Sequence, residues 1–228
     1  MLTALVFDFD GLILDTETPE MVSWQEEFES AGVQLDRDRW ITWIGTYAGV
    51  DLYDELSTAL GAEVDRETVR ASRQERYARL IATEEVRPGV LDYLARADEL
   101  GLRLGVASSS TNEWVRRHLT TLGLEGRFHS ICGRDDVGGV AKPAPDVYLE
   151  VLRRLGVEAE DAVALEDSPN GVRAAKAAAI SCVYVPNGLT RSLACDEADL
   201  CVDSLADMPL AELMATLPGR PGTPSATR

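Results

Sequence analysis

Short apolar runs that alternate with helix-like segments constrain the fold of this chain more than any other feature. Alternation of this kind is typical of a parallel sheet whose strands are joined by helical crossovers. We therefore predict the α/β class, with a Rossmann-like parallel sheet core and helices on both faces. The apolar runs lie at 2–7, 103–108, 130–133, 162–166, 181–185 and 198–202, and the helical segments at 90–100, 112–122, about 145–155, 170–178 and after Pro209.

A long segment without a strand-like run, 16–85, separates the first apolar run from the others. Its apolar residues, among them Met21, Trp24 and Phe28, recur at helical spacing. Because it leaves from the carboxyl end of a strand, where open parallel sheets bind ligands, it could close over a site as a lid. The predicted organisation is an α/β core at 1–15 and 86–216, a helical cap at 16–85 and a disordered tail at 217–228.

Charge and composition narrow the possible partners. The net charge is -17, which disfavours nucleic acid because its phosphates would be repelled. No stretch approaches the roughly 20 apolar residues that span a bilayer, and the N-terminus lacks the basic region of a signal peptide. We therefore expect a cytoplasmic monomer that acts on a small molecule and binds neither membrane nor nucleic acid. Four cysteines without C-x-x-C spacing and only two histidines argue against zinc.

Acidic residues follow two of the predicted strands. Asp8 and Asp10 end the first apolar run, and positions i and i+2 of a strand face the same side. Glu166 and Asp167 end the run at 162–166. Because the carboxyl ends of parallel strands meet at one edge, we expect all four carboxylates to lie close together.

Such a group of acids needs a cation. Two unit charges 4 Å apart repel by about 4 kcal/mol at an effective dielectric constant near 20. Oxygen-only ligands favour Mg²⁺, and Lys142, one of only two lysines in the chain, adds an ammonium. With the hydroxyl of Ser108 after the second core strand, these groups would form a phosphoryl site in which a carboxylate can attack phosphorus.

The ordered motifs D-F-D-G-x-x-x-D-T, Ser, Lys-Pro and E-D-S-x-x-G resemble those of the haloacid dehalogenase superfamily. Within it, the chain is most similar to the β-phosphoglucomutase-like phosphatases with a helical cap, and the resemblance covers roughly residues 2 to 210. It implies that Asp8 is the nucleophile and a metal ligand. It also implies that Asp10 is general acid and then base, and gives its backbone carbonyl to Mg²⁺. Lys142 would neutralise Asp8, Asp167 would ligate Mg²⁺, and Glu166 would ligate it directly or through water.

The resemblance also implies substrate contacts. Ser108 would bind the transferring phosphoryl group, helped by the N–H of Ser109 and by Asn112. A cap arginine that clamps a second phosphate in the mutases is replaced by Ala48 here, although Arg73 could supply another cap cation. These departures weaken the mutase interpretation.

The function predicted from these motifs is a Mg²⁺-dependent phosphatase of small phosphorylated metabolites, sugar or polyol phosphates, acting through an aspartyl-phosphate. The first alternative is a phosphosugar mutase of the β-phosphoglucomutase type. A second is a non-catalytic phospho-acceptor switch, which the inserted cap disfavours because receiver domains need an open edge. Dehalogenation is disfavoured because Asp10 supplies an acid that dehalogenases of the superfamily lack, and phosphonate cleavage because segment 16–85 contains no lysine.

Two of the motif stretches also fit ordinary helix starts. Ser168 fits an N-cap with Pro169 in the first turn. Ser109 or Ser110 fits the N-cap of the helix that begins near Asn112. These positions can serve the helices whether or not the neighbouring residues are catalytic.

Overall fold

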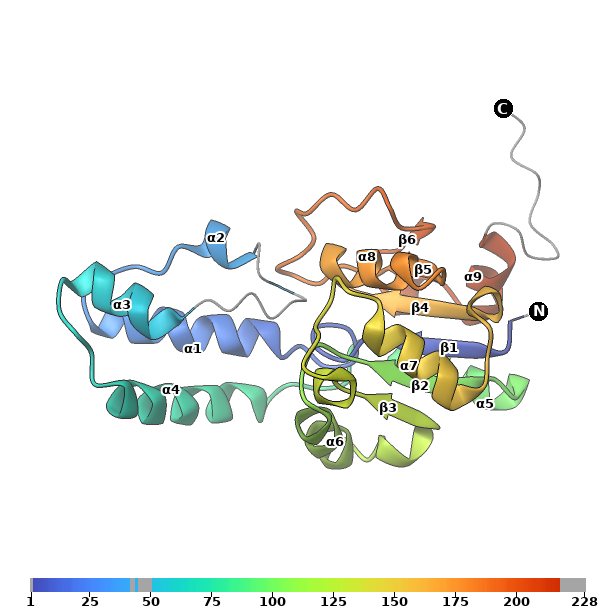
Figure 1. Cartoon of the computed structure of the whole chain (residues 1–228), viewed down its shortest axis with the longest axis horizontal. Helices are drawn as coiled ribbons and strands as arrows, with labels where there is room; N and C mark the ends of the chain where they lie inside the picture. Colours follow the sequence, from blue (N-terminus) through green and yellow to red (C-terminus); the bar gives the residue numbers. More distant parts are fainter. Residues whose placement is uncertain (1, 42–43, 45–50, 218–228) are drawn as a thin grey trace.

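A six-stranded parallel sheet forms the centre of the part of the molecule at the right of Figure 1, with the strand order β3-β2-β1-β4-β5-β6. The computed structural model describes residues 2–41, 44 and 51–217. The sheet confirms the predicted α/β class and places β1 in its interior, so that the residues after β1 lie between those after β2 and β4. The strands are β1 (Ala4–Phe7), β2 (Arg103–Ala107), β3 (Ser130–Cys132), β4 (Ala162–Glu166), β5 (Ser181–Tyr184) and β6 (Leu200–Cys201).

Helices cover both faces of the sheet, as the sequence predicts. Leu5 and Phe7 of β1 pack with one buried cluster, which includes α5, α6 and α9, whereas Ala4 and Val6 pack with a second cluster, which includes α7 and α8. A strand buried on both faces explains the uninterrupted apolar run. The helices of this part are α5 (Val90–Leu100), α6 (Asn112–Thr121), α7 (Asp146–Leu155), α8 (Pro169–Ala177) and α9 (Leu210–Thr216), with short 3-10 turns η1 (Glu125–Arg127), η2 (Arg134–Val137), η3 (Ala159–Asp161) and η4 (Leu205–Asp207).

Two predicted helix starts have different outcomes. Ser168 caps α8 by accepting a hydrogen bond from the Gly171 N–H at 3.1 Å, and Pro169 lies in the first turn, which confirms that prediction. The predicted cap of α6 at Ser109 or Ser110 is wrong. Thr111 caps this helix by accepting from the N–H of Trp114, because it is the residue directly before Asn112, where the helix begins.

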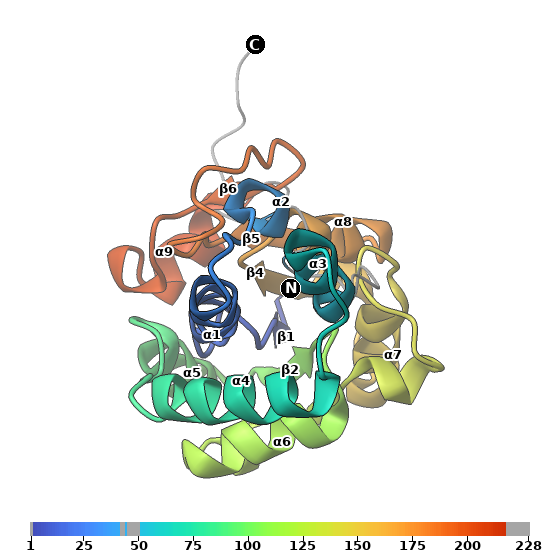
Figure 2. The ribbon, with the colours of Figure 1, turned by 90° about the vertical axis from the view of Figure 1, so that its left-hand side faces the viewer.

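Four helices stand together beyond the carboxyl edge of the sheet (Figures 1 and 2). The described residues of 16–85 form helices and turns and no strand. This arrangement supports the proposed division into core and cap. These helices are α1 (Glu17–Ser30), α2 (Arg37–Ile41), α3 (Leu52–Leu60) and α4 (Arg66–Ile81), and their buried cluster contains Met21, Trp24, Phe28, Trp40, Ile44, Leu56 and Val69, joined by Leu189 from the core.

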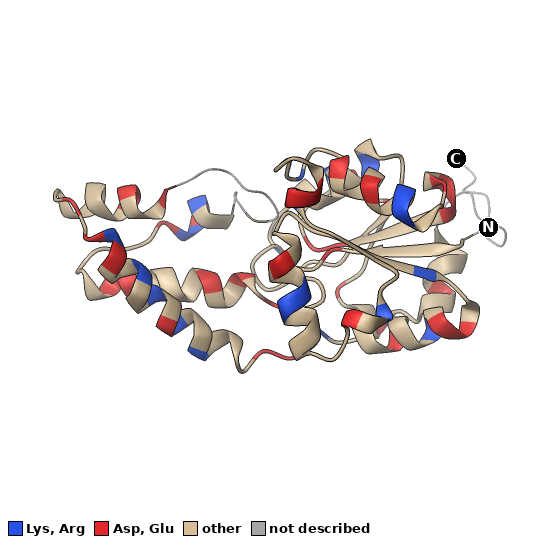
Figure 3. Cartoon of the chain, turned by 60° about the horizontal axis from the view of Figure 1, so that its bottom comes forward, with Lys and Arg blue, Asp and Glu red and all other residues tan. Residues whose placement is uncertain are grey.

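Charged residues of both signs are spread along the helices of both parts (Figure 3). In the cap, ion pairs connect α4 to α1, with Arg73 2.7 Å from Glu20 and Arg76 3.2 Å from Glu27. These pairs are partly exposed, so apolar contacts contribute more to holding the two helices together. Among the described residues, none of the helices has the length and apolar character needed to cross a membrane.

The two chain crossings between core and cap are hydrogen-bonded to each other. Leu14 forms isolated bridges with Asp10 and Val86, and the Arg87 N–H donates to the Ile13 carbonyl at 2.9 Å. The Arg87 guanidinium also donates to the carbonyl of Gly11. The crossings therefore form one connected ribbon.

At the C-terminus, Leu217 is fully buried against the first cluster, so the core includes this residue, which the sequence prediction placed in the tail. Residues 218–228, and the stretch that contains Ala48, lie outside the described residues.

Candidate active site

Asp8 directly follows β1 and lies in a buried ionic cluster. The Lys142 ammonium is 2.5 Å from Asp8 Oδ1 and 2.5 Å from Glu166 Oε1. Lys142 is 1% exposed and Asp8 5%. Burial lowers the pKa of Lys142, but the charges of Asp8 and Glu166 raise it more, and the net pKa lies above its ordinary value. The charges of Asp8 and Glu166 therefore favour the ammonium form of Lys142 between the two carboxylates.

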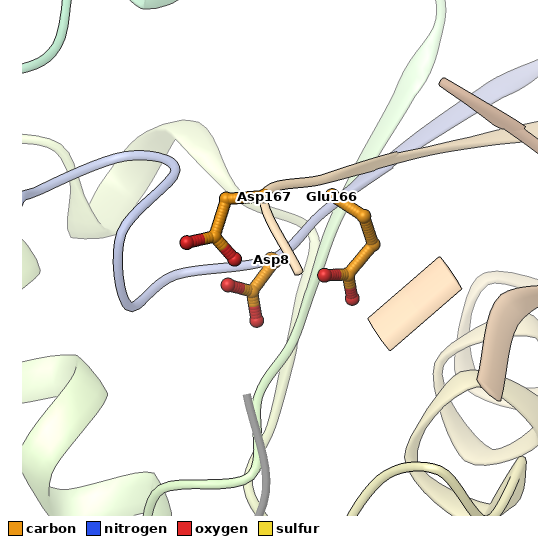
Figure 4. Close-up of side chains that lie close together, drawn as sticks. All are labelled: Asp8, Glu166 and Asp167. Carbon is orange, nitrogen blue, oxygen red and sulfur yellow. The ribbon is translucent and has the colours of Figure 1, made fainter. Parts of the chain in front are cut away.

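Three carboxylates converge where β1 and β4 end (Figure 4). Asp8, Glu166 and Asp167 each offer one oxygen, and these oxygens lie within 4.8 Å of one another. Glu166 Oε2 and Asp167 Oδ1 are buried and have no hydrogen-bond partner among the described residues. Orphaned oxygens in an all-oxygen donor set fit a hard divalent cation such as Mg²⁺.

The electrostatics of the cluster also favour a cation. Burial raises the pKa of Asp8 well above its ordinary value, against the opposing charge of Lys142, and the Glu166 and Asp10 charges raise it further. Burial likewise raises the pKa of Asp167, and the charges of Asp8 and Glu166 add to this. One ammonium thus compensates these carboxylates only in part.

Asp10 turns its side chain to a separate set of donors. Its Oδ1 accepts hydrogen bonds from Thr16 Oγ1 at 2.8 Å and from Trp114 Nε1 at 3.0 Å. Its Oδ2 accepts from Ser108 Oγ at 3.0 Å. The carboxyl of Asp10 is therefore held beside the three-carboxylate cluster and not within it. The predicted contribution of its backbone carbonyl to a metal site stays a prediction.

Two glycines make room for the site. Gly11 has φ +85°, and a Cβ there would collide with the Asp167 carboxyl and the Asn187 amide. A Cβ at Gly171 would collide with the Glu166 carboxyl. The Asn187 amide donates to Asp167 Oδ2 at 2.6 Å and so fixes that carboxyl. The chain turns at Gly11 after two acids because only glycine leaves space for the acid of the next strand.

A model of the haloacid dehalogenase-like hydrolase family matches residues 5–185 of the chain. The chain belongs to this family. YhcW from Bacillus subtilis (strain 168) is 44% identical over 214 residues, which cover 94% of this chain and 97% of YhcW. Hexitol phosphatase B from Escherichia coli (strain K12) is 34% identical over 196 residues, 80% of this chain and 83% of that protein.

Solved structures of the family agree in fold. The crystal structure of a CbbY mutant from Rhodobacter sphaeroides, in complex with xylulose-(1,5)bisphosphate, superposes with a TM-score of 0.76. It is 32% identical and covers 93% of this chain and 99% of its own. The family match and the phosphatase relatives show that this chain is a hydrolase that acts on phosphate esters.

Asn112, which the sequence predicts as a substrate contact, forms hydrogen bonds within the core. The Asn112 amide nitrogen donates to the Ile131 carbonyl at 3.0 Å and to Asp136 Oδ2 at 2.6 Å. Its backbone N–H donates to Asp135 Oδ1. Both hydrogens of the Asn112 amide are engaged in this arrangement, and its predicted contact with a phosphoryl group stays a prediction.

The serines after β2 have distinct partners. Ser108 Oγ, which donates to Asp10, accepts from the Ser110 N–H at 2.9 Å. Ser109 Oγ accepts a hydrogen bond from the backbone N–H of Lys142 at 3.2 Å and so connects the segment that carries Lys142 to the end of β2. The predicted phosphoryl contact of the Ser109 N–H stays a prediction.

Arg73, the predicted cap cation, is paired within the cap. Its Nη1 donates to Glu20 Oε2 at 2.7 Å, and its guanidinium carbon lies 5.2 Å from the Trp24 ring centroid. The indole N–H of Trp24 donates to the other carboxylate oxygen of Glu20. The positive charge of Arg73 is thus compensated by Glu20, which makes it a weaker clamp for a second phosphate.

Sequence reasoning missed several residues that hold the site, and a signal existed for some of them. Asn187 follows β5 at the same edge, so the strand-end rule that found Asp8 could have found it. Thr16 belongs to the D-T pair of the first motif. Trp114 and the Tyr148 hydroxyl, which donates to Glu166, lie on helices at core-like spacing, and no sequence signal separates them from ordinary packing residues.

Glu17, at the start of α1, should make stability depend on pH. Burial first, then the charges of Asp10 and Glu20, raise its pKa from 4.5 to about 8. Between these values the unfolded chain binds fewer protons than the native protein, so stability falls as pH rises through this window. We expect Glu17→Gln to stabilise the metal-free protein by about 2 kcal/mol at pH 8. This figure is smaller than the pKa shift alone would give, because solvent partly screens the Glu17 carboxylate. The substitution should have little effect at pH 4.

Urea unfolding in the presence of a chelator, measured across this range, checks the prediction. The exposed Glu63→Gln variant is the control and should leave the free energy of unfolding unchanged. A Glu17→Gln difference that does not change with pH would contradict the expectation.

Proposed function

We propose that this hydrolase is a Mg²⁺-dependent phosphatase of sugar or polyol phosphates that works through an aspartyl-phosphate at Asp8. The observation that carries the proposal is the buried Lys142 ammonium, 2.5 Å from both Asp8 and Glu166, beside orphaned carboxylate oxygens of Glu166 and Asp167. Cationic groups around a carboxylate allow a dianionic phosphoryl group to approach it.

In the first step an oxygen of Asp8 attacks phosphorus, and the bond from phosphorus to the ester oxygen breaks. Asp10 gives its proton to that oxygen, so the product leaves as an alcohol. Lys142 compensates the charge on the phosphoryl oxygens, and Ser108 holds Asp10. Asp8, Glu166 and Asp167 would hold Mg²⁺, which when bound supplies further charge compensation for the phosphoryl group.

In the second step Asp10, now a carboxylate, takes a proton from water as the water oxygen attacks phosphorus. The bond between phosphorus and Asp8 breaks, which releases inorganic phosphate and restores the Asp8 carboxylate. The proton balance closes because Asp10 recovers the proton that it gave to the alcohol.

The charge state of the cap supports hydrolysis over mutase chemistry. A mutase must hold the second phosphate of a bisphosphate, whereas Arg73 is paired with Glu20 and the stretch 45–50 contains no lysine or arginine. The relatives support the substrate class: hexitol phosphatase B is named for polyol phosphates, and CbbY was crystallised with a phosphorylated sugar.

A metabolite panel tests the proposed function. The purified protein, with and without Mg²⁺, is offered hexitol phosphates, aldose and ketose phosphates, xylulose 1,5-bisphosphate and β-glucose 1-phosphate, and released phosphate is measured. We expect Mg²⁺-dependent release from at least one sugar or polyol phosphate. Interconversion of β-glucose 1-phosphate and glucose 6-phosphate without release would instead establish a mutase. A long-lived phosphoryl group on Asp8 with no turnover of any ester would establish a switch.

A further inference from the structure

The indole of Trp114 is the donor to Asp10 that differs in kind from the others. Trp114 Nε1 donates to Asp10 Oδ1 at 3.0 Å, whereas Thr16 and Ser108 contact the same carboxyl through hydroxyls. A hydroxyl can donate or accept, but an indole N–H only donates. Of these three partners, Trp114 is the one that cannot reverse its hydrogen bond when Asp10 gains a proton.

This asymmetry favours one oxygen of Asp10 as the carrier of the proton. A proton on the oxygen that faces Trp114 and Thr16 would weaken the indole hydrogen bond, because a protonated carboxyl oxygen is a poorer acceptor. The opposite oxygen faces Ser108, whose hydroxyl can turn to accept. Trp114 therefore favours the protonated carboxyl that has its O–H at Oδ2.

The indole itself is held by aromatic and cationic groups on several sides. The His118 ring lies at 4.4 Å from it in an edge contact, and the Tyr77 ring of cap helix α4 lies at 5.8 Å. The Arg117 guanidinium carbon is 4.9 Å from the ring centroid. Burial first and then the charge of Arg117 lower the pKa of His118, although the charge of Asp10 opposes this shift, so the neutral form of the ring is favoured. Aromatic contacts of this kind fix the direction of the N–H.

We propose that Trp114 is a positioning residue that orients the carboxyl of Asp10 and directs its transferable proton to Oδ2. The inference rests on the proposed role of Asp10 as the acid that protonates the leaving oxygen. Because Tyr77 comes from the cap, the packing of α4 helps to set the position of this indole.

The test compares two kinds of leaving group. An alkoxide from a sugar or polyol phosphate must be protonated as it leaves, whereas nitrophenolate is stable without a proton. The ratio kcat/KM reports the steps up to loss of the leaving group, and so it isolates the acid from the later base. We expect Trp114→Phe to lower kcat/KM about tenfold for an alkyl phosphate and by less than about twofold for p-nitrophenyl phosphate.

A second variant removes the donor without changing the shape. Replacement of Trp114 by 3-benzothienylalanine keeps the two fused rings and lacks the N–H, so it should show the same selective loss even if Trp114→Phe folds poorly. Tyr93→Phe is the control, because it removes a hydrogen bond to the Met208 carbonyl outside the site. It should leave kcat/KM unchanged for both the alkyl phosphate and p-nitrophenyl phosphate.

Asp10→Asn separates this inference from the proposed function. If Asp10→Asn fails to show a selective loss on alkyl phosphates, the proposed acid is wrong. If Asp10→Asn is selective but the two Trp114 variants lower kcat/KM equally for both substrates, or for neither, then Trp114 has only a packing role and the inference is overturned.

Discussion

Asp8→Asn is expected to lower turnover of every phosphate ester by at least about 10⁴-fold, because an amide cannot form the aspartyl-phosphate. The substitution keeps the volume of the side chain and removes one of the carboxylates that meet at the end of β1. Lys142 retains Glu166 as a partner, so we expect the variant to remain folded. Phosphate release and thermal unfolding of the same preparation measure both outcomes.

A matched change elsewhere provides the control for Asp8→Asn. Asp92 is exposed in the first turn of α5, and Asp92→Asn removes one negative charge without touching the site. It should keep full activity. Turnover by Asp8→Asn above one hundredth of the unsubstituted rate would mean that another group receives the phosphoryl.

Lys142→Met should combine a large loss of activity with a large loss of stability. Without its ammonium, the buried carboxylates of Asp8, Glu166 and Asp167 lose the cation that compensates them. Breaking a buried ion pair on one side costs about 3–5 kcal/mol. Urea unfolding in a chelator should show this loss, and saturating Mg²⁺ should recover part of it, because the metal binds the native protein and not the unfolded chain.

The other lysine of the chain offers the comparison for Lys142→Met. Lys176 pairs with Asp199 at 2.6 Å on a partly exposed surface, where an ion pair contributes about 0–1 kcal/mol. Lys176→Met should therefore change stability little and leave activity intact. Equal stability of Lys142→Met and Lys176→Met in a chelator would show that the buried cluster does not depend on its ammonium.

The fold was largely predictable because it depends on patterns that a single sequence displays. β1 is fully buried, so its four residues must all be apolar, and a run of that kind is visible without a structure. The edge strand β6 is shorter than predicted and spans only Leu200–Cys201. Apolar residues at a strand end do not reveal where pairing stops, since the partner strand decides that.

The site was predictable where topology alone places a residue. Asp8 and Asp167 directly follow strands, and Glu166 is the last residue of one. Neighbouring parallel strands bring them together whatever their side chains do. The hydrogen bonds of Asn112 could not be predicted, because its partners, among them Asp136, come from an element distant in sequence. Arg73 has the same difficulty, since Glu20 lies on another helix. A residue type shows what a side chain can bind, but only the folded neighbours show what it does bind.

The ribbon formed by the two crossings has a mechanical consequence. Because Leu14 pairs with both Asp10 and Val86, and Arg87 is bonded to Ile13, the outgoing and returning chains cannot swing separately. We expect any opening of α1–α4 away from the sheet to be a rocking about a single axis through this ribbon. Since Asp10 itself forms part of that axis, each such rocking would strain or relax the backbone that carries the acid.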